Sequence, residues 1–392
     1  MDEPLIERMR AYGETVFAEM TRLATETGAV NLGQGFPDTD GPASLLEAAA
    51  RHIREGVNQY PPGPGHPELR RAVSRYRARH YGTEYDPDTE VHATVGATAG
   101  IAAALLALVD RGDEVVVFEP MYDSYAAMIT LAGGVRRPVT LRPDPATGRF
   151  TFDPAELRAA VGPRTRMVLV NTPHNPTGTV FTAEELEHVA AVCREHDLIA
   201  FTDEVYEFLA FDGRPHVPLA SLPGMRERTL TASSAGKMFA VTGWKTGWVT
   251  GPEPLVGAVR RVNQFLTFSA NGALQLAVAE ALDTQGEWVA AQRDTLRGKR
   301  DRLAAGLADA GFDVGVCEGT YFVMADIRPL GRTDGVELAR ALPREAGVAA
   351  IPAQVFYDRQ EEGAHLLRFA FCKEDAVLDE AVARLSAWHG KA

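Results

Sequence analysis

The sequence has few cysteines and no long apolar run. Its 392 residues include only three cysteines, Cys193, Cys317 and Cys372, which lie far apart and form no CxxC pair. This count excludes a disulfide framework and favours a reducing compartment, so we expect the cytoplasm. The first four residues, Met-Asp-Glu-Pro, are acidic and have no apolar segment, so we expect no secretory signal.

An excess of basic residues is also missing. The formal net charge is -13, which disfavours nucleic acids and anionic membranes as partners because both are polyanions. The longest apolar run, residues 101–109, is too short to span a bilayer. A small anionic ligand remains compatible with this charge, because a few local cations are enough to bind it. The length and ordinary hydrophobic content are typical of a globular chain that can bury two cores.

Short apolar segments alternate with amphipathic segments over most of the chain. The predicted strands are 93–95, 114–118, 167–170, 198–202, 229–233 and 247–250, and the predicted helices between them are 98–110, 123–132, 154–161 and 183–196. Such alternation favours an α/β fold with a mostly parallel sheet covered by helices.

The pattern changes after about residue 285. A long charged helix is predicted first, and the later elements are strands at 321–327 and 365–371 and helices at 334–345 and 375–388. We therefore expect a large domain, residues 36–285, and a smaller α+β domain formed by residues 1–35 and 286–392.

Lys237 stands in a run of small residues directly after a predicted strand. Most lysines are solvated surface groups, but small neighbours would let a flat ring approach this one. A nucleophilic lysine needs a lowered pKa, which burial or a nearby cation supplies. A nucleotide-binding P-loop is excluded, because Thr231 and Met238 stand where that motif needs glycine and a hydroxyl residue.

Other polar side chains follow predicted strands, at the edge where open α/β sheets bind ligands. Asp203 follows an apolar strand; it could pair with a ring nitrogen or cap a helix. Tyr206 would face the same side of a helical turn, and it could donate to a ring oxygen or pack in the core. Asn175, in a proline-rich turn, could donate to the same oxygen or serve only the turn.

Three further features of the sequence could bind a phosphate group or an aromatic ring of a ligand. The turn 96–100, which contains Ala97 and Thr98, joins a strand to an apolar helix, so its free N–H groups favour an anion, although such turns also occur without one. Ser234 and Lys245 would add a hydroxyl and a cation. Tyr122 follows another strand end, where it could stack on a ring or pack at a rim.

Arg368 lies inside an apolar strand, 365–371. An arginine there needs a carboxylate, which could belong to a ligand or to an internal ion pair. Gly35, in the segment 31–37, permits close approach of the backbone.

Taken in order, these residues resemble the class I pyridoxal-phosphate aminotransferases of fold type I. The likeness covers essentially the whole chain, and the segments that carry it are 31–37, 58–65, 175–178, 203–206, 234–248 and 368–371. It implies a large, mostly parallel seven-stranded sheet domain, a smaller α+β domain, pyridoxal 5'-phosphate as the cofactor and no metal.

The resemblance also implies a role for each candidate residue. Catalysis would rest on Lys237, which would bind the cofactor covalently and move protons, on Asp203 at the pyridine nitrogen and on Tyr206 at the phenolate oxygen. The remaining cofactor contacts would be Ala97, Thr98, Ser234 and Lys245 at the phosphate, Tyr122 on the ring and Asn175 at the phenolate oxygen. The substrate would meet Arg368, Asn175, Gly35 and Phe17. Tyr60 would reach the phosphate of a partner subunit, which implies a homodimer with shared active sites.

The implied activity is ping-pong transfer of an amino group from an L-amino acid to a 2-oxo acid. A carbon–sulfur lyase that eliminates from cysteine conjugates shares every cofactor residue and stays open as an alternative. A non-catalytic sensor fused to a DNA-binding module is disfavoured, because no basic winged-helix segment precedes Asn31.

Within the family, the segment 15–38 resembles the kynurenine, glutamine and methionine branch and the N-succinyldiaminopimelate aminotransferases. Phe17 and Ser269 stand where kynurenine-type enzymes often have tryptophan and histidine. The segment 263–272 lacks the arginine that aspartate-specific relatives use, so a short acidic substrate is disfavoured.

Overall fold

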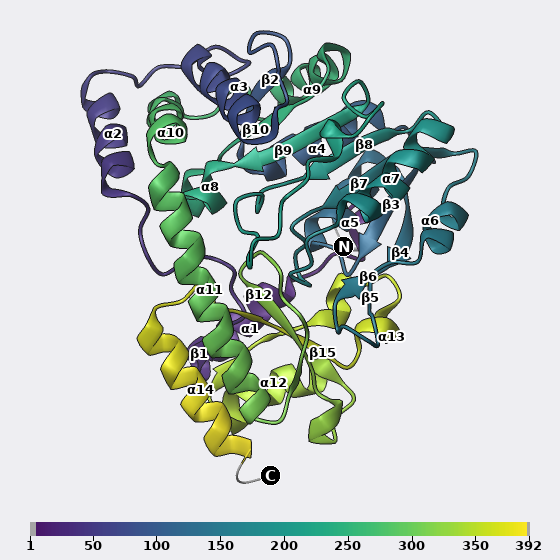
Figure 1. Cartoon of the computed structure of the whole chain (residues 1–392), viewed down its shortest axis with the longest axis vertical. Coiled ribbons are helices and arrows are strands. Elements are labelled where there is room, and N and C mark those ends of the chain that lie inside the picture. Colours follow the sequence, from purple (N-terminus) through teal and green to yellow (C-terminus); the bar gives the residue numbers. More distant parts are fainter. Residues whose placement is uncertain (1–4, 390–392) are drawn as a thin grey trace.

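A computed structural model describes residues 5–389 of the protein. A sheet of seven strands lies in the upper part of Figure 1. Its strands lie in the order β2 (Val91–Val95), β10 (Thr246–Thr250), β9 (Thr229–Ser234), β8 (Ile199–Asp203), β7 (Thr165–Asn171), β3 (Glu114–Glu119) and β4 (Val135–Thr140). From β9 to β4 all neighbours are parallel, and β10 alone runs antiparallel to both β2 and β9. The expected mostly parallel seven-stranded sheet is confirmed.

Buried apolar side chains cover both faces of this sheet. Consecutive strand residues point to opposite faces, and Trp248 and Val249 in β10 belong to two separate buried clusters. Ile101 shares the Val249 cluster, whereas Leu69 and Val278 share the Trp248 cluster. The helices that accompany the sheet are α2 (Ala43–Arg54), α3 (Pro67–Tyr81), α4 (Gly96–Leu108), α5 (Asp123–Ala132), α6 (Pro154–Ala160), α7 (Ala183–Glu195), α8 (Ala235–Met238), α9 (Glu253–Leu266) and α10 (Gly272–Thr284).

A second, antiparallel sheet of four strands lies in the lower part of Figure 1. Its order is β11 (Asp313–Val314), β12 (Phe322–Asp326), β15 (Leu366–Ala370) and β14 (Ile351–Pro352). Two short strand pairs complete the sheets: β1 (Val30–Asn31) with β13 (Val348–Ala349), and β5 (Arg142–Pro143) with β6 (Phe150–Thr151). The remaining helices are α1 (Val16–Thr27), α11 (Gly286–Asp309), α12 (Gly335–Glu345), α13 (Gln360–Gly363) and α14 (Asp375–His389).

The predicted domain division stays a prediction, although several contacts bear on it. The long helix α11 runs from the side of the large sheet down to α14 (Figure 1). Helix α1 packs on α12 and β14, next to the second sheet. Tyr12, before α1, instead donates from its hydroxyl to the carbonyl of Ala126 in α5 (2.9 Å). Residues 1–4 and 390–392, which the prediction places in the small domain, lie outside the described residues.

All six strands predicted for the large sheet are present, with ends that differ by a few residues. The prediction omits the edge strand β4 and the helices α2, α3, α9 and α10. Between residues 5 and 389, no helix is both long and apolar enough to cross a membrane. All three cysteines are buried and free.

Candidate active site

A cavity of about 310 Å³ lies at the carboxyl ends of β7, β8 and β9. Every predicted site residue except Tyr60 lines it: Phe17, Gly35, Ala97, Thr98, Tyr122, Asn175, Asp203, Tyr206, Ser234, Lys237, Lys245 and Arg368. Strands of both sheets, the helices α1, α4 and α8 and the turns between these elements supply the residues. The fold therefore brings together side chains that are up to 351 positions apart in the sequence, from Phe17 to Arg368.

Lys237 lies on the short helix α8, which begins directly after β9. Its Nζ donates to the hydroxyl of Tyr321 (2.7 Å) and to the carbonyl of Gly35 (3.3 Å). Burial lowers the pKa of Lys237 to about 8, with only partial compensation from nearby acidic groups. A substantial fraction of this amine is therefore neutral, and nucleophilic, near physiological pH.

Asp203 is the last residue of β8 and is 4% exposed. Its Oδ2 accepts from the hydroxyl of Tyr125 (2.6 Å), and its Oδ1 accepts from the N–H of Val205 (3.3 Å). Burial raises the pKa of Asp203 to about 6. A turn follows Asp203 in place of a helix, so the helix-cap alternative is wrong. Its carboxylate is available to a cationic partner in the cavity.

Arg368 lies in the middle of β15 and is 1% exposed. Its guanidinium donates to Oδ1 of Asn175 (3.0 Å) and to the carbonyl of Gly33 (2.9 Å), and its Nε has no partner. The Phe322 ring lies 4.0 Å from the guanidinium carbon. No carboxylate of residues 5–389 forms an ion pair with it, so the internal ion pair weighed from the sequence is absent from that part of the chain. Burial lowers the pKa of Arg368 to about 10, as expected for a cation that lacks a counter-ion.

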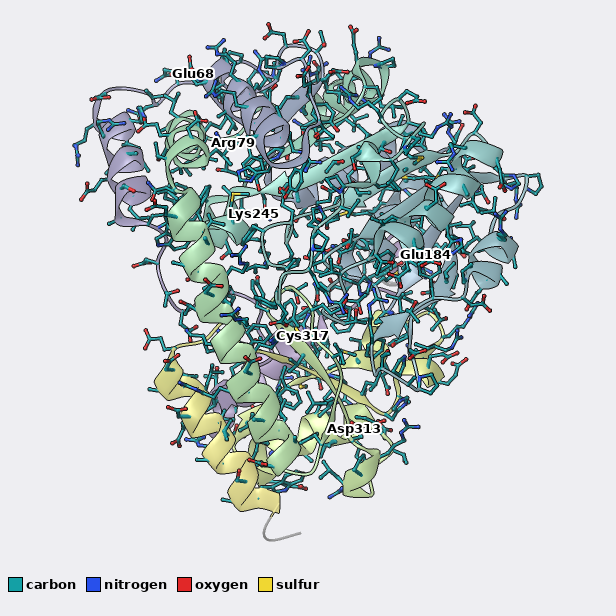
Figure 2. The ribbon with its side chains drawn as sticks, viewed as in Figure 1. Glu68, Arg79, Glu184, Lys245, Asp313 and Cys317 are labelled. Atoms are coloured by element: carbon teal, nitrogen blue, oxygen red, sulfur yellow. The ribbon has the colours of Figure 1, made fainter. Side chains whose placement is uncertain are left out.

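The start of α4 and the segment after α8 form the end of the cavity suited to a phosphate. Gly96 begins α4 with a φ of 69°, in the left-handed region that favours glycine, and an added Cβ would lie 3.1 Å from Cε of Lys245. Nζ of Lys245, labelled in Figure 2, donates to Oγ1 of Thr98 (3.4 Å). Ser234 ends β9 beside them. Backbone N–H groups, a hydroxyl and a cation thus converge on one place.

Gly35 approaches the second sheet so closely that no side chain fits. A Cβ added there would overlap the ring of Phe322 and lie 3.2 Å from the ring of Tyr321. The close approach predicted for this glycine is therefore present.

Tyr60 lies outside the cavity. Its side chain is 83% exposed, and its ring packs edge-on against Phe268 with 5.4 Å between centroids. It lines a separate hollow formed by residues 57–61 and 269–272. Its contact with a partner subunit stays a prediction.

Three aromatic residues that contact predicted site residues were not predicted as part of the site. Tyr125 donates to Asp203, Tyr321 bonds Lys237 and Gly35, and Phe322 packs on Arg368. Tyr321 and Phe322 come from β12 and the residue before it, so no local pattern connects them to Lys237. Tyr125 follows Tyr122 by three positions on α5, which is the one spacing that could have drawn attention to it.

A buried ionic cluster lies behind the cavity-facing residues. Arg77 of α3 donates to Glu204 (2.9 Å) and to Glu207 (3.0 Å), and Ser233 donates to Glu207 (2.6 Å). Each of these three partners is a chain neighbour of a residue that lines the cavity, namely Asp203, Tyr206 and Ser234. The cluster therefore fixes the backbone that carries them.

The cavity fits pyridoxal 5'-phosphate by the chemistry of its groups. An amine with a lowered pKa suits the aldehyde of that cofactor, a buried carboxylate that forms no ion pair with any of residues 5–389 suits the pyridine nitrogen, and an anion-binding helix start suits the phosphate. Arg368 forms no ion pair with the described residues either, so its charge can meet a carboxylate from outside the chain.

Comparison with known proteins agrees with this fit. A family model described as "Aminotransferase class I and II" matches residues 27–385. The probable N-succinyldiaminopimelate aminotransferase DapC of Mycobacterium tuberculosis is 54% identical over 390 residues, which are 97% of this chain and 98% of the relative. The methionine aminotransferase of Escherichia coli is 40% identical over 98% of this chain and 99% of the relative.

A solved structure supports the fold in the same way. The structure of N-succinyldiaminopimelate aminotransferase from Mycobacterium tuberculosis aligns with a TM-score of 0.96 at 54% identity and covers 98% of this chain and 100% of that chain. The chain therefore belongs to the class I and II aminotransferases, and it is a pyridoxal-phosphate-dependent aminotransferase of fold type I that acts on amino and oxo acids.

Proposed function

We propose that this aminotransferase uses N-succinyldiaminopimelate as its preferred amino-group partner. The observation that carries the proposal is the 54% identity, over 97% of the chain, to a relative named for that substrate. Buried Arg368, whose charge has no carboxylate partner among the described residues, supports an α-amino acid in the cavity. The methionine and kynurenine relatives, at 40% and 36% identity, make those amino acids the necessary comparisons.

We also propose the roles of the cavity residues. When bound, the cofactor supplies an aldehyde that captures amines and a ring that stabilises negative charge at the substrate α-carbon. Nζ of Lys237 attaches the cofactor and, once displaced, carries the α-proton. Asp203 keeps the ring nitrogen protonated, and Tyr206 and Asn175 hold the ring oxygen.

The remaining residues orient the cofactor and the substrate. The phosphate is bound by Ala97 and Thr98 at the start of α4, by Ser234 at the end of β9 and by Lys245 before β10. Tyr122 packs on the ring. Arg368 binds the substrate α-carboxylate in a bidentate manner, with Asn175 and Gly35 beside it. Phe17 limits the space for the substrate side chain from α1.

We propose that two chains form a homodimer in the cytoplasm. Phe265 is 84% exposed and lies at the end of α9 near Leu266, Phe268 and Tyr60, which are also exposed. Such an apolar group on one face is typical of an interface. Tyr60 would then reach the phosphate in the partner subunit. The three free, buried cysteines agree with a reducing compartment.

The substrate proposal is tested by single-turnover absorbance. Holoenzyme is mixed with N-succinyldiaminopimelate, methionine, kynurenine and glutamine in turn, and the conversion of the cofactor from its aldehyde form to its amine form is followed. We expect the largest ratio of rate to dissociation constant for N-succinyldiaminopimelate. A larger ratio for methionine or kynurenine overturns the substrate assignment, and Lys237→Ala, which cannot attach the cofactor, is the control.

The same enzyme also tests the lyase alternative. No relative reported above is named for that activity. We expect no pyruvate or ammonia from a cysteine conjugate in the absence of an added oxo acid; steady release of both would revive the alternative.

A further inference from the structure

The hydroxyl of Tyr321 stands between Lys237 and the backbone of Gly35. It accepts from Nζ of Lys237 at 2.7 Å and donates to the carbonyl oxygen of Gly35 at 2.6 Å. Tyr321 is 1% exposed and lies directly before β12, with its ring packed edge-on against Tyr206 at 5.1 Å between centroids. This hydroxyl is therefore held in one orientation by groups from two distant parts of the chain.

The direction of these hydrogen bonds determines where the lone pair of the Lys237 amine points. The single proton of Tyr321 is committed to Gly35, so towards Lys237 the hydroxyl is an acceptor. Nζ of Lys237 also donates to Gly35, at 3.3 Å. A neutral amine has two N–H groups and one lone pair. Since both N–H groups have acceptors, the lone pair is directed away from Tyr321 and Gly35.

We propose that Tyr321 is a further catalytic residue, which receives the amine of Lys237 after the substrate has displaced it and aims its lone pair at the substrate α-carbon. This inference rests on the proposed role of Lys237. When Nζ takes the α-proton, the C–H bond breaks, its electron pair stays on the substrate, and Nζ gains a third N–H. Tyr321 and Gly35 keep the other two N–H groups bonded throughout, so the proton that Nζ has gained is the one it would return, to the cofactor carbon that bonds the substrate nitrogen.

The hydroxyl also stabilises the protonated form of the amine. An ammonium donates more strongly than an amine, so loss of an acceptor lowers the pKa of Lys237. The other titratable groups around Nζ are Asp203, Tyr206, Cys372, Arg368 and Lys245. Tyr321→Phe leaves all five of these side chains in place and removes only the Tyr321 hydroxyl, so a shift in that variant reports on the missing hydroxyl.

The test compares Tyr321→Phe with Tyr85→Phe. Tyr85 is also buried, at 4% exposure, but its hydroxyl has no hydrogen-bond partner among the described residues and it does not line the cavity, so this variant controls for loss of a buried hydroxyl. The first measurement uses holoenzyme carrying the amine form of the cofactor, in which Lys237 is free. The pH dependence of acetic anhydride labelling at Lys237, measured by mass spectrometry, gives the pKa of the amine.

The second measurement is the single-turnover rate with N-succinyldiaminopimelate or methionine that carries hydrogen or deuterium at the α-carbon. We expect Tyr321→Phe to lower the labelling pKa by about one unit. We expect the rate of turnover to fall about 10- to 100-fold, with a larger deuterium isotope effect and little change in the dissociation constant. Tyr85→Phe should match the wild type in both the labelling pKa and the single-turnover rate.

Two results would overturn the inference. One is a labelling pKa for Tyr321→Phe equal to that of Tyr85→Phe. The other is a weaker binding of the amino acid in Tyr321→Phe with no change in the single-turnover rate. Failure of the wild type to react with any amino acid would instead reject the proposed role of Lys237, so the two failures are distinguishable.

Discussion

Arg368 and Arg77 are both 1% exposed, yet the structure predicts opposite consequences when each loses its charge. Arg77 bonds two buried carboxylates, Glu204 and Glu207. Arg368 bonds only a side-chain amide oxygen and a backbone carbonyl. Changing either to glutamine keeps a polar side chain and removes the cation, so the pair of variants separates a structural charge from a functional one.

The expected changes in free energy depend on which groups lose their cation in each variant. Arg77→Gln leaves Glu207 without its buried cation and Glu204 with His216 alone, and breaking a buried ion pair costs about 3–5 kcal/mol. Arg368→Gln leaves no stranded charge among the described residues, so we expect its unfolding free energy to stay within about 1 kcal/mol of the wild type. Against an amino acid, however, Arg368→Gln loses a buried charge pair with the α-carboxylate. That loss is about 2–5 kcal/mol, or roughly 30- to 5,000-fold in kcat/KM.

The assay is urea unfolding of both variants, without substrate, together with the single-turnover reaction of Arg368→Gln. Amines that lack a carboxylate serve as the control substrates, because their slow reaction should be the same in wild type and Arg368→Gln. The reasoning is refuted if Arg368→Gln unfolds as easily as Arg77→Gln, since Arg368 would then have a counter-ion within the fold. It is refuted equally if Arg368→Gln reacts with amino acids at the wild-type rate.

Three more outcomes are expected. Tyr125→Phe removes the donor to Asp203, so the affinity for pyridoxal 5'-phosphate at neutral pH should fall about 10-fold by equilibrium dialysis, and an unchanged affinity would contradict the contact. Because Lys237 attacks only as the neutral amine and its pKa is about 8, the rate of cofactor attachment, followed by borohydride trapping and mass, should rise from pH 6 to 8 and level off above; a flat profile would contradict the assignment. Phe265→Asp should convert the proposed homodimer to monomer in sedimentation velocity, and a mass equal to that of the wild type would remove this face from the interface.

The residues at strand ends were predictable because their signal is local. An apolar strand followed by a polar side chain is visible in the sequence at Asp203 and, after a turn, at Asn175. Parallel strands place their carboxyl ends at one edge, so these residues had to converge. The family resemblance assigned a role to each candidate residue, and every residue with an assigned role except Tyr60 lines the cavity.

Contacts between distant segments were not predictable in this way. Tyr321 meets Lys237 only because the second sheet packs against the end of the first, and nothing near position 321 indicates that neighbour. Strand β4 was missed because two arginines and Pro138 interrupt its apolar pattern. As an edge strand it tolerates the proline, and its arginines are paired with carboxylates, Arg136 with Asp358 and Arg137 with Glu114 of β3.

Asp203 and Glu204 show how one strand end serves two purposes. The two carboxylates are adjacent in the chain and both are buried, yet burial raises the pKa of Asp203 to about 6, whereas Arg77 and His216 outweigh burial and lower the pKa of Glu204 to about 2. Successive residues of an extended chain point to opposite sides, so Asp203 faces the cavity and Glu204 faces the ionic cluster.

The signs of these two shifts oppose one another. A carboxyl whose pKa is lowered by folding stabilises the protein above its unfolded pKa, and that stability is lost as the pH falls from about 4.5 towards 2. A carboxyl whose pKa is raised behaves in the opposite sense, since ionising Asp203 as the pH rises through about 6 costs stability. The protein thus holds one buried carboxylate, Glu204, whose charge Arg77 and His216 compensate and, next to it, Asp203, at which burial outweighs the hydrogen bonds and the nearby charge of Lys237. With the proposed contact between Asp203 and a protonated ring nitrogen, bound cofactor would supply at Asp203 the positive charge that Arg77 supplies at Glu204.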